Sequence, residues 1–159
     1  MTLSDLHKIL AEIPFKDISI GYSEFEFAEK ETFDDFQVGY RINEEGINLS
    51  SEEKGGWQNS WYTIGIDDLG DPIFIDLNDG IIYTSQEEEE GWEPIAIASN
   101  FDKFKQIVFK LNEMSQGRET PKKFEKSPIP AKAKNEFYSL LNEEHEDIDI
   151  EYWSGIIED

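Results

Sequence analysis

Apolar residues at the start of the chain recur with the spacing of a helix. Over residues 3–10 they return every three or four positions, and either Thr2 or Ser4 can cap the first turn. Pro14 lies just past the last periodic residue, where a proline cannot continue a helix. The pattern therefore predicts a short first helix.

The period then changes to two, which is typical of strands. The alternation over residues 18–27 predicts one strand, and the apolar run over residues 36–42 predicts another. A turn over residues 43–46 is expected to return the chain to residues 47–49.

Residues 61–84 predict three further strands joined by tight turns. Apolar runs over residues 61–66, 73–77 and 81–84 are separated by turn residues at 67–70 and 78–80. Asp79-Gly80 between β-branched runs is a strong hairpin signal, because glycine accepts the positive φ that such turns require. We expect an antiparallel meander.

The last third of the chain predicts helices. Apolar residues from Phe101 to Met114 lie on one helical face, with Ser99 and Asp102 spaced as a capping box and Gly117 at the end. A proline- and lysine-rich connection over residues 120–130 leads to a helix over residues 131–141. Residues 148–157 fit a strand or a helix, and we prefer a helix capped by Asp149.

These elements predict a single α+β domain over residues 1–159, with a mostly antiparallel sheet flanked by helices. The strand order of the amino-terminal half stays open. The chain has 159 residues, of which 38% are hydrophobic, including 11 Phe, 6 Tyr and 4 Trp, which is too much bulky apolar material for a disordered protein. We expect a soluble, cytoplasmic protein, since no apolar run approaches the roughly 20 residues of a membrane helix and the first residues lack a secretory signal pattern.

The formal net charge of −22 limits the kinds of partner that the chain can bind. Residues 1–102 carry 24 acidic and five basic side chains, residues 103–134 carry three and nine, and residues 135–159 carry nine and none. Such a charge argues against direct binding to nucleic acid, whose phosphates would be repelled. The basic segment is expected to offset neighbouring acidic charge within the fold.

A search for catalytic chemistry finds no recognisable apparatus. The chain has no cysteine, which excludes disulfides, thiolate catalysis and cysteine-based zinc or iron–sulfur sites, and its two histidines, His7 and His145, have no partner at metal-ligand spacing. Phosphate-binding loops and the serine nucleophile elbow are also missing. Asp76 and Asn78 resemble part of a calcium loop, but the distal glutamate is not in place. We expect no catalytic residue, no metal and no cofactor.

The aromatic residues divide into scaffold and candidate contacts. Trp61, Phe74, Tyr83 and Phe101 recur as core residues do. Trp57 and Trp92 each follow a glycine beside polar or acidic residues, where an exposed ring can anchor a partner, although packing inside the fold is slightly favoured for both. The candidate partner-binding residues are Trp57, Asp67, Asp68, Asp71, Glu87, Glu88, Glu89, Glu90 and Trp92.

Five segments in a fixed order carry a family resemblance. They are Trp61-Tyr62-Thr63-Ile64-Gly65, Gly70-Asp71-Pro72-Ile73-Phe74-Ile75-Asp76, Gly80-Ile81-Ile82-Tyr83, Gly91-Trp92-Glu93-Pro94 and Ser99-Asn100-Phe101-Asp102-Lys103-Phe104. Over about residues 57–108 the chain resembles the SUKH superfamily, which includes a yeast regulator of cell wall assembly and many bacterial proteins. The superfamily's amino-terminal Leu-Pro signature is missing, and Pro14-Phe15 stands in its place.

The resemblance implies a curved sheet flanked by helices, with no catalytic residues to carry over. For bacterial members it implies frequent service as immunity proteins that bind and neutralise a toxin domain. Our leading hypothesis is a non-enzymatic domain whose acidic loops cover a basic toxin domain, such as a nuclease, because complementary charge speeds association.

Two alternatives stay open: a regulator that binds a small ligand or a glycan on its tryptophans, and, with less support, a hydrolase built on paired carboxylates. The expected partner is a protein rather than nucleic acid or membrane, and the oligomeric state, monomer or weak dimer, stays open.

Overall fold

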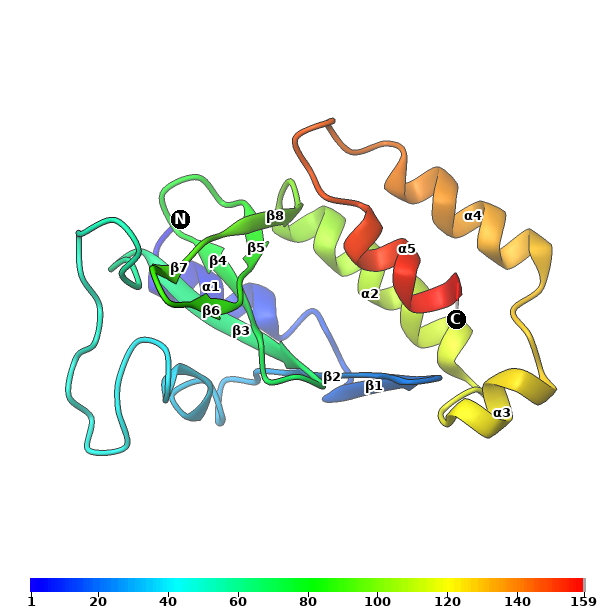
Figure 1. The fold of residues 1–159 in the computed structure, drawn as a ribbon, viewed down its shortest axis with the longest axis horizontal. Coiled ribbons are helices and arrows are strands. Elements are labelled where there is room, and N and C mark those ends of the chain that lie inside the picture. The colour runs from blue at the N-terminus through cyan, green and yellow to red at the C-terminus, as the bar shows by residue number, and fades with distance from the viewer. Residues whose placement is uncertain (159) are drawn as a thin grey trace.

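The computed structural model describes residues 1–158, which form one α+β domain around a six-stranded antiparallel sheet (Figure 1). The strand order is β1-β2-β3-β4-β5-β8, and a separate two-stranded hairpin pairs β6 with β7. The strands are β1 (Asp17–Ile20), β2 (Ser23–Phe27), β3 (Trp61–Asp67), β4 (Pro72–Asp76), β5 (Ile82–Thr84), β6 (Glu87–Glu88), β7 (Gly91–Trp92) and β8 (Ile95–Ala98). The helices are α1 (Leu3–Leu10), the short 3₁₀ helix η1 (Asp35–Gln37), α2 (Phe101–Ser115), α3 (Pro121–Lys126), α4 (Ala131–Leu141) and α5 (Glu151–Glu158).

The predicted α+β class, the meander and most helices are confirmed. Strands β3, β4 and β5 pair antiparallel in sequence order, and α1 begins with a capping box between Thr2 and Asp5. The ambiguous last segment is a helix, α5, and the Asp149 carboxylate accepts a hydrogen bond from the backbone N–H of Glu151 at 3.1 Å. Each of these elements could be predicted because its signal is local.

The single strand predicted over residues 18–27 is wrong, because the chain reverses in the middle of it. Strands β1 and β2 form a hairpin in which Ile20 pairs with Ser23. Gly21 takes a φ of 57°, as the first position of a two-residue hairpin turn requires, and Tyr22 is exposed at the tip. The apolar alternation changes phase at this turn, from even-numbered positions to odd-numbered ones. That change of phase was the sequence signal for the turn between β1 and β2.

The strand predicted over residues 36–42 is also wrong, and a buried glutamine explains the difference. Gln37 ends η1 with only 4% of its surface exposed. Its side-chain amide donates to the carbonyls of Phe33 at 2.9 Å and Thr63 at 2.8 Å, and its carbonyl accepts from the Thr63 N–H at 2.9 Å. Strand β2 pairs with β3 only as far as Gly65, so the Gln37 side chain takes the place of a strand along Thr63. If residues 36–42 formed a strand, the Gln37 side chain could not make these hydrogen bonds along Thr63.

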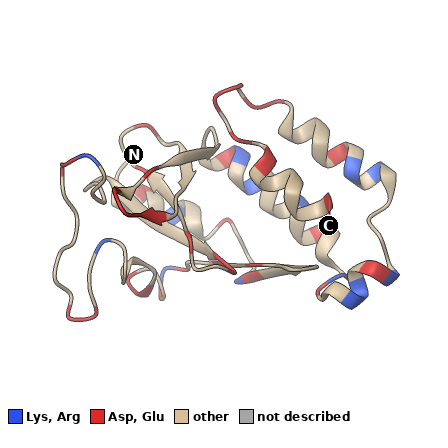
Figure 2. Cartoon of the chain, in the orientation of Figure 1, with Lys and Arg blue, Asp and Glu red and all other residues tan. Residues whose placement is uncertain are grey.

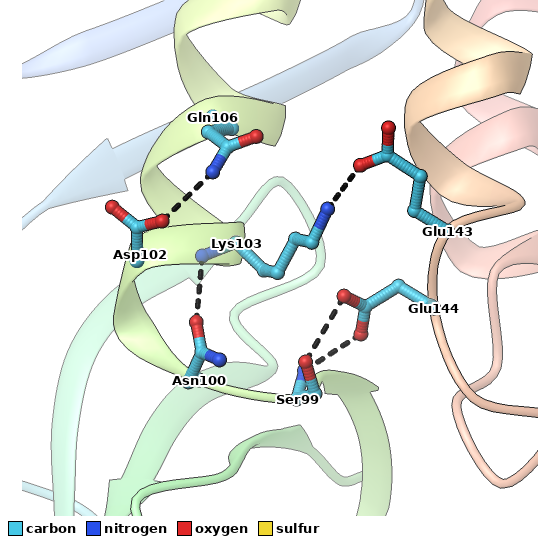
Figure 3. Close-up of polar contacts among 7 residues, drawn as sticks. All are labelled: Ser99, Asn100, Asp102, Lys103, Gln106, Glu143 and Glu144. Carbon is cyan, nitrogen blue, oxygen red and sulfur yellow. Dashed lines mark hydrogen bonds and ion pairs between the residues drawn. The ribbon is translucent and has the colours of Figure 1, made fainter.

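The start of α2 differs from the predicted capping box. Asn100, not Ser99, is the N-cap, and its side chain accepts from the Lys103 N–H at 2.8 Å. Ser99 instead donates its backbone N–H and its hydroxyl to the Glu144 carboxylate, at 2.7 and 3.0 Å (Figure 3). Lys103 also pairs with Glu143. These contacts tie the loop after α4 to the junction between β8 and α2.

The sheet buries apolar side chains on both faces. Ile73 and Ile75 belong to the main core, which includes α2 and Trp153 of α5. Phe74 points the opposite way, as alternate strand residues do, and packs in a second cluster with Trp57 and Trp61. Helices α2, α4 and α5 lie together at one end of the molecule (Figure 1). Residues 1–158 contain no helix long and apolar enough to cross a membrane.

We predict that Gln37→Ala lowers the free energy of unfolding by about 2–4 kcal/mol, because it leaves the Thr63 N–H and two buried carbonyls without partners. Urea unfolding followed by circular dichroism measures the change. The matched control is Gln106→Ala on the exposed side of α2, which should alter stability by less than about 0.5 kcal/mol. Equal effects of the two substitutions would contradict the bridging role of Gln37.

Candidate functional site

Four consecutive glutamates project from the small hairpin formed by β6 and β7. Glu87 pairs with Trp92 and Glu88 with Gly91, and Glu89 and Glu90 form the connecting turn. All four glutamate side chains are exposed. The predicted acidic segment therefore has a defined conformation that places its carboxylates on the surface.

A contact between two glycines fixes this hairpin to the loop before β3. The Trp92 N–H donates to the Gly55 carbonyl at 2.8 Å. A Cβ added at Gly91 would overlap the Gly55 carbonyl oxygen, and one added at Gly55 would overlap the Glu90 carbonyl oxygen. Gly55 and Gly91 also have φ values of 87° and 105°, which L side chains rarely adopt. Only glycines allow the two backbones to come this close.

Trp57 lies beneath the hairpin and packs inside the fold, so its ring does not offer a partner an exposed anchor. Its surface is 1% exposed, and its indole N–H donates to the Trp61 carbonyl at 3.1 Å. The ring centroid lies 4.8 Å from that of Phe74 and 5.4 Å from that of Trp92. Trp57 is thus the centre of the second aromatic cluster and supports Trp92, which is half-buried.

A surface cleft of about 1050 Å³ lies beside the hairpin, and we call it the hairpin cleft. It is lined by Lys54, Gly55, Gln58, Trp61, Glu88, Glu89, Glu90, Gly91, Trp92, Glu93 and Pro94. Of the predicted contact residues it brings together Trp92 and three of the four glutamates. Glu87 lies on the same hairpin outside the lining.

The predicted aspartates occupy the turn between β3 and β4. Asp67 shapes this turn, since its Oδ1 accepts from the backbone N–H groups of Leu69 and Asp71, each at 3.0 Å. Burial raises the pKa of the Asp67 carboxyl, and burial together with the charge of Asp67 raises the pKa of Asp71. Asp68 is exposed on the turn, and it lines neither the hairpin cleft nor the smaller cleft beside the turn.

A second cleft, of about 330 Å³, opens beside this turn, and we call it the side cleft. It is lined by Asp67, Leu69, Asp71, Thr84, Ser85, Gln86, Glu88, Glu93, Ile95 and Tyr152. Glu88 and Glu93 line both clefts, so the two are neighbours on one surface. The predicted site residues line this pair of clefts, apart from Trp57 below the surface and Asp68 and Glu87 outside both linings.

Sequence reasoning missed Tyr152, Leu69 and Ile95. The Tyr152 hydroxyl lies 3.5 Å from the Asp67 Oδ2 across 85 positions of sequence, and burial raises the pKa of this tyrosine. No local pattern places a residue of the last helix beside a turn of the sheet. Leu69 lies in a turn and Ile95 lies on the edge strand β8, and both side chains are exposed. The sequence does not show that these apolar side chains are exposed.

The geometry offers little for hydrolysis or metal binding. Asp67 and Asp71 are neighbours with raised pKa values, as a carboxylate pair requires, but the Asp67 Oδ1 already accepts two hydrogen bonds from its own turn. Within residues 1–158, no group of three or more histidine, aspartate or glutamate side chains is placed to hold a metal ion. What the arrangement does provide is concave negative surface next to apolar side chains.

Comparison with known proteins gives one match. A family model described as the SMI1 / KNR4 family (SUKH-1) matches residues 8–106. No curated protein and no solved structure matches the chain. The matched segment runs from α1 into α2 and includes every residue of both clefts except Tyr152.

We predict that Gly91→Ala releases the hairpin from Gly55 and costs about 2–3 kcal/mol of stability, through the overlap as well as the backbone strain. The tryptophan emission should shift to longer wavelength as Trp92 becomes solvated. Gly46→Ala is the matched control, because Gly46 has a φ of 79° but open space around it. This control should cost about 1 kcal/mol and leave the emission unchanged. An unshifted emission in Gly91→Ala would refute the two-glycine contact.

We predict that Asp67→Asn raises the melting temperature at pH 7 by about 2–4 °C, equivalent to about 1 kcal/mol in this half-buried, partly solvent-screened site. The raised pKa means that the folded protein binds this proton more readily than the unfolded chain does, so the carboxylate costs stability at neutral pH. That cost, and with it the gain, should vanish as pH falls through the raised pKa to below about 4. Thermal unfolding between pH 3 and pH 8 tests this, with the exposed Asp68→Asn as control. A gain that persists in acid would contradict it.

Proposed function

The chain belongs to the SMI1 / KNR4 family (SUKH-1), and from this premise we propose that it is a non-catalytic protein-binding domain that acts as an immunity protein against a basic toxin domain. Bacterial members of the superfamily that the chain resembles frequently serve in this way. The observation that carries the proposal is the acidic hairpin, in which four exposed glutamates lie on the same hairpin as a half-buried tryptophan that lines a cleft.

The glutamates of the hairpin have one lysine, Lys54, in the lining of the same cleft. The ion pairs described for residues 1–158 involve Lys16, Lys103, Lys105 and Lys110, and none includes a glutamate of the hairpin. In Figure 2 the hairpin is coloured as acidic, whereas basic residues occur along α2, α3 and α4, interspersed with acidic ones. A basic partner would supply the missing opposite charge, and complementary potentials would speed its encounter.

The hairpin is also held in one place, which favours binding. The contact between Gly55 and Gly91 fixes it, and Trp57 fills the space below. A partner therefore meets a hairpin backbone that is already ordered, so less conformational entropy is lost on association. Trp92 adds an aromatic surface at the edge of the cleft, of the kind that often dominates binding energy.

Glycan binding would use the same cleft, and we consider it the weaker candidate. Stacking on sugar rings needs exposed aromatic faces, but Trp57 is buried and Trp61 is only 7% exposed. Trp92 alone is left as a platform, among glutamates that favour a cation over a neutral sugar.

The test begins with co-expression of the chain and candidate toxin domains encoded beside it. We predict that the chain rescues growth and forms a complex at low salt, and that replacing Glu87, Glu88, Glu89 and Glu90 by glutamine lowers the association rate constant about 10- to 100-fold. Stopped-flow or surface-based kinetics at several salt concentrations measure this rate.

The matched control replaces Glu24, Glu26, Glu44 and Glu45, which are exposed elsewhere, by glutamine and so changes the net charge equally. It should lower the rate only a few-fold. Equal slowing by the two sets would show that net charge acts without the hairpin. Failure of the wild-type chain to rescue growth or form a complex would refute the immunity proposal.

A further inference from the structure

The side cleft combines apolar walls with acidic groups. Leu69 is 75% exposed and Ile95 is 43% exposed, and both line this cleft of about 330 Å³. Asp67 and Asp71 line it as well, and Glu88 and Glu93 stand where it meets the hairpin cleft. Large apolar side chains that stay exposed around a concavity indicate a contact surface, and the carboxylates restrict what can fill it.

The cleft holds negative charge that no group within it balances. Its lining includes no lysine or arginine, and neither Asp67 nor Asp71 takes part in an ion pair among the described residues. Burial raises the pKa of both carboxyls, so the folded protein keeps them charged at a cost in stability. A cation placed between them would remove this cost.

The far wall of the cleft is rigid. Tyr152 comes from α5, whose position is set by the hydrogen bond from the Trp153 indole N–H to the Ile97 carbonyl at 2.7 Å and from the Asp149 N–H to the Ala96 carbonyl at 2.8 Å. The loop before α5 is anchored in turn by Glu144 on Ser99 (Figure 3). The cleft is therefore formed before any partner arrives.

We propose that the side cleft receives a lysine side chain of the basic partner, with the ammonium group beside the carboxylates of Asp67 and Asp71 and the aliphatic stem between Leu69 and Ile95. The assignment rests on the proposed function and names the group that the partner presents. Glu88 and Glu93 continue the surface into the hairpin cleft, so that a neighbouring basic residue of the same segment can lie there.

Two features favour lysine over arginine. The planar fork of a guanidinium binds best to a carboxylate with both oxygens free, whereas the Asp67 Oδ1 already accepts two backbone N–H groups and its Oδ2 lies 3.5 Å from the Tyr152 hydroxyl. An ammonium is a compact charge that needs no such geometry. The four methylenes of a lysine also match a cleft whose entrance is apolar.

The experiment compares three acetylated and amidated heptapeptides that alternate glycine with lysine, with arginine or with 2,4-diaminobutyrate, a cationic residue whose stem is two methylenes shorter. Calorimetry and methyl NMR on the intact chain measure their affinities and contacts. We expect the lysine peptide to bind about five- to tenfold more tightly than the diaminobutyrate peptide, because of the extra apolar contact. The methyl resonances of Leu69 and Ile95 should shift with the lysine peptide.

The double variant Leu69→Ala, Ile95→Ala should lose the preference for lysine and keep its affinity for the diaminobutyrate peptide. The matched control is Tyr22→Ala, Leu49→Ala, which trims exposed apolar side chains outside the cleft and should keep the preference. Urea unfolding checks that both variants are folded. Equal binding of the lysine and diaminobutyrate peptides, tighter binding of the arginine peptide, or a preference that survives in the cleft variant would overturn the proposal.

The peptides contain no toxin, so the two proposals can fail separately. A lysine preference in a chain that rescues no toxin-expressing cells would leave the side cleft as assigned and refute the immunity role. Rescue without a lysine preference would refute the side-cleft assignment alone.

Discussion

The close contact between Gly55 and Gly91 is the constraint on which the candidate site depends. It brings the backbone of the acidic hairpin within hydrogen-bonding distance of the loop before β3, and it leaves Trp57 buried below. Without this contact the four glutamates would lie on an unattached loop. Their charges would repel neighbouring acidic residues, and their carboxylates would have no fixed arrangement on the surface. With it, part of the net charge of −22 lies on a hairpin of fixed backbone conformation, to which a basic partner can be complementary.

A second constraint comes from the end of the chain. The SUKH-1 match stops at residue 106, but α5 reaches back to the sheet, with the Trp153 ring centroid 6.2 Å from that of Phe25 and 6.0 Å from that of Phe104. This packing carries Tyr152 to the turn of Asp67. The family segment thus supplies the hairpin cleft, and the carboxyl-terminal helix completes the side cleft. The basic segment, residues 103–134, begins inside the matched segment and pairs with acidic neighbours through Lys103, Lys105 and Lys110.

The sequence was sufficient to predict elements whose signal is local. It was insufficient for segments whose conformation depends on contacts with residues far away in the sequence. Helical periodicity and the Asp-Gly turn located α1, α2 and the meander, and the acidic run and Trp92 were identified as parts of one surface. Residues 36–42 look like a strand until Gln37 is seen to replace one along Thr63, 26 positions away. Trp57 looks like an edge residue until the hairpin covers it. Such outcomes depend on three-dimensional contacts that no window of sequence contains.

We propose that the acidic hairpin and the adjoining aspartate turn form the binding face of an immunity protein. Amide hydrogen exchange, compared between the free chain and its complex with the toxin domain encoded beside it, tests this most directly. We expect new protection at residues 67–71 and 87–92, with little change along α3 and α4. Protection confined to those helices, with the hairpin unchanged, would contradict it.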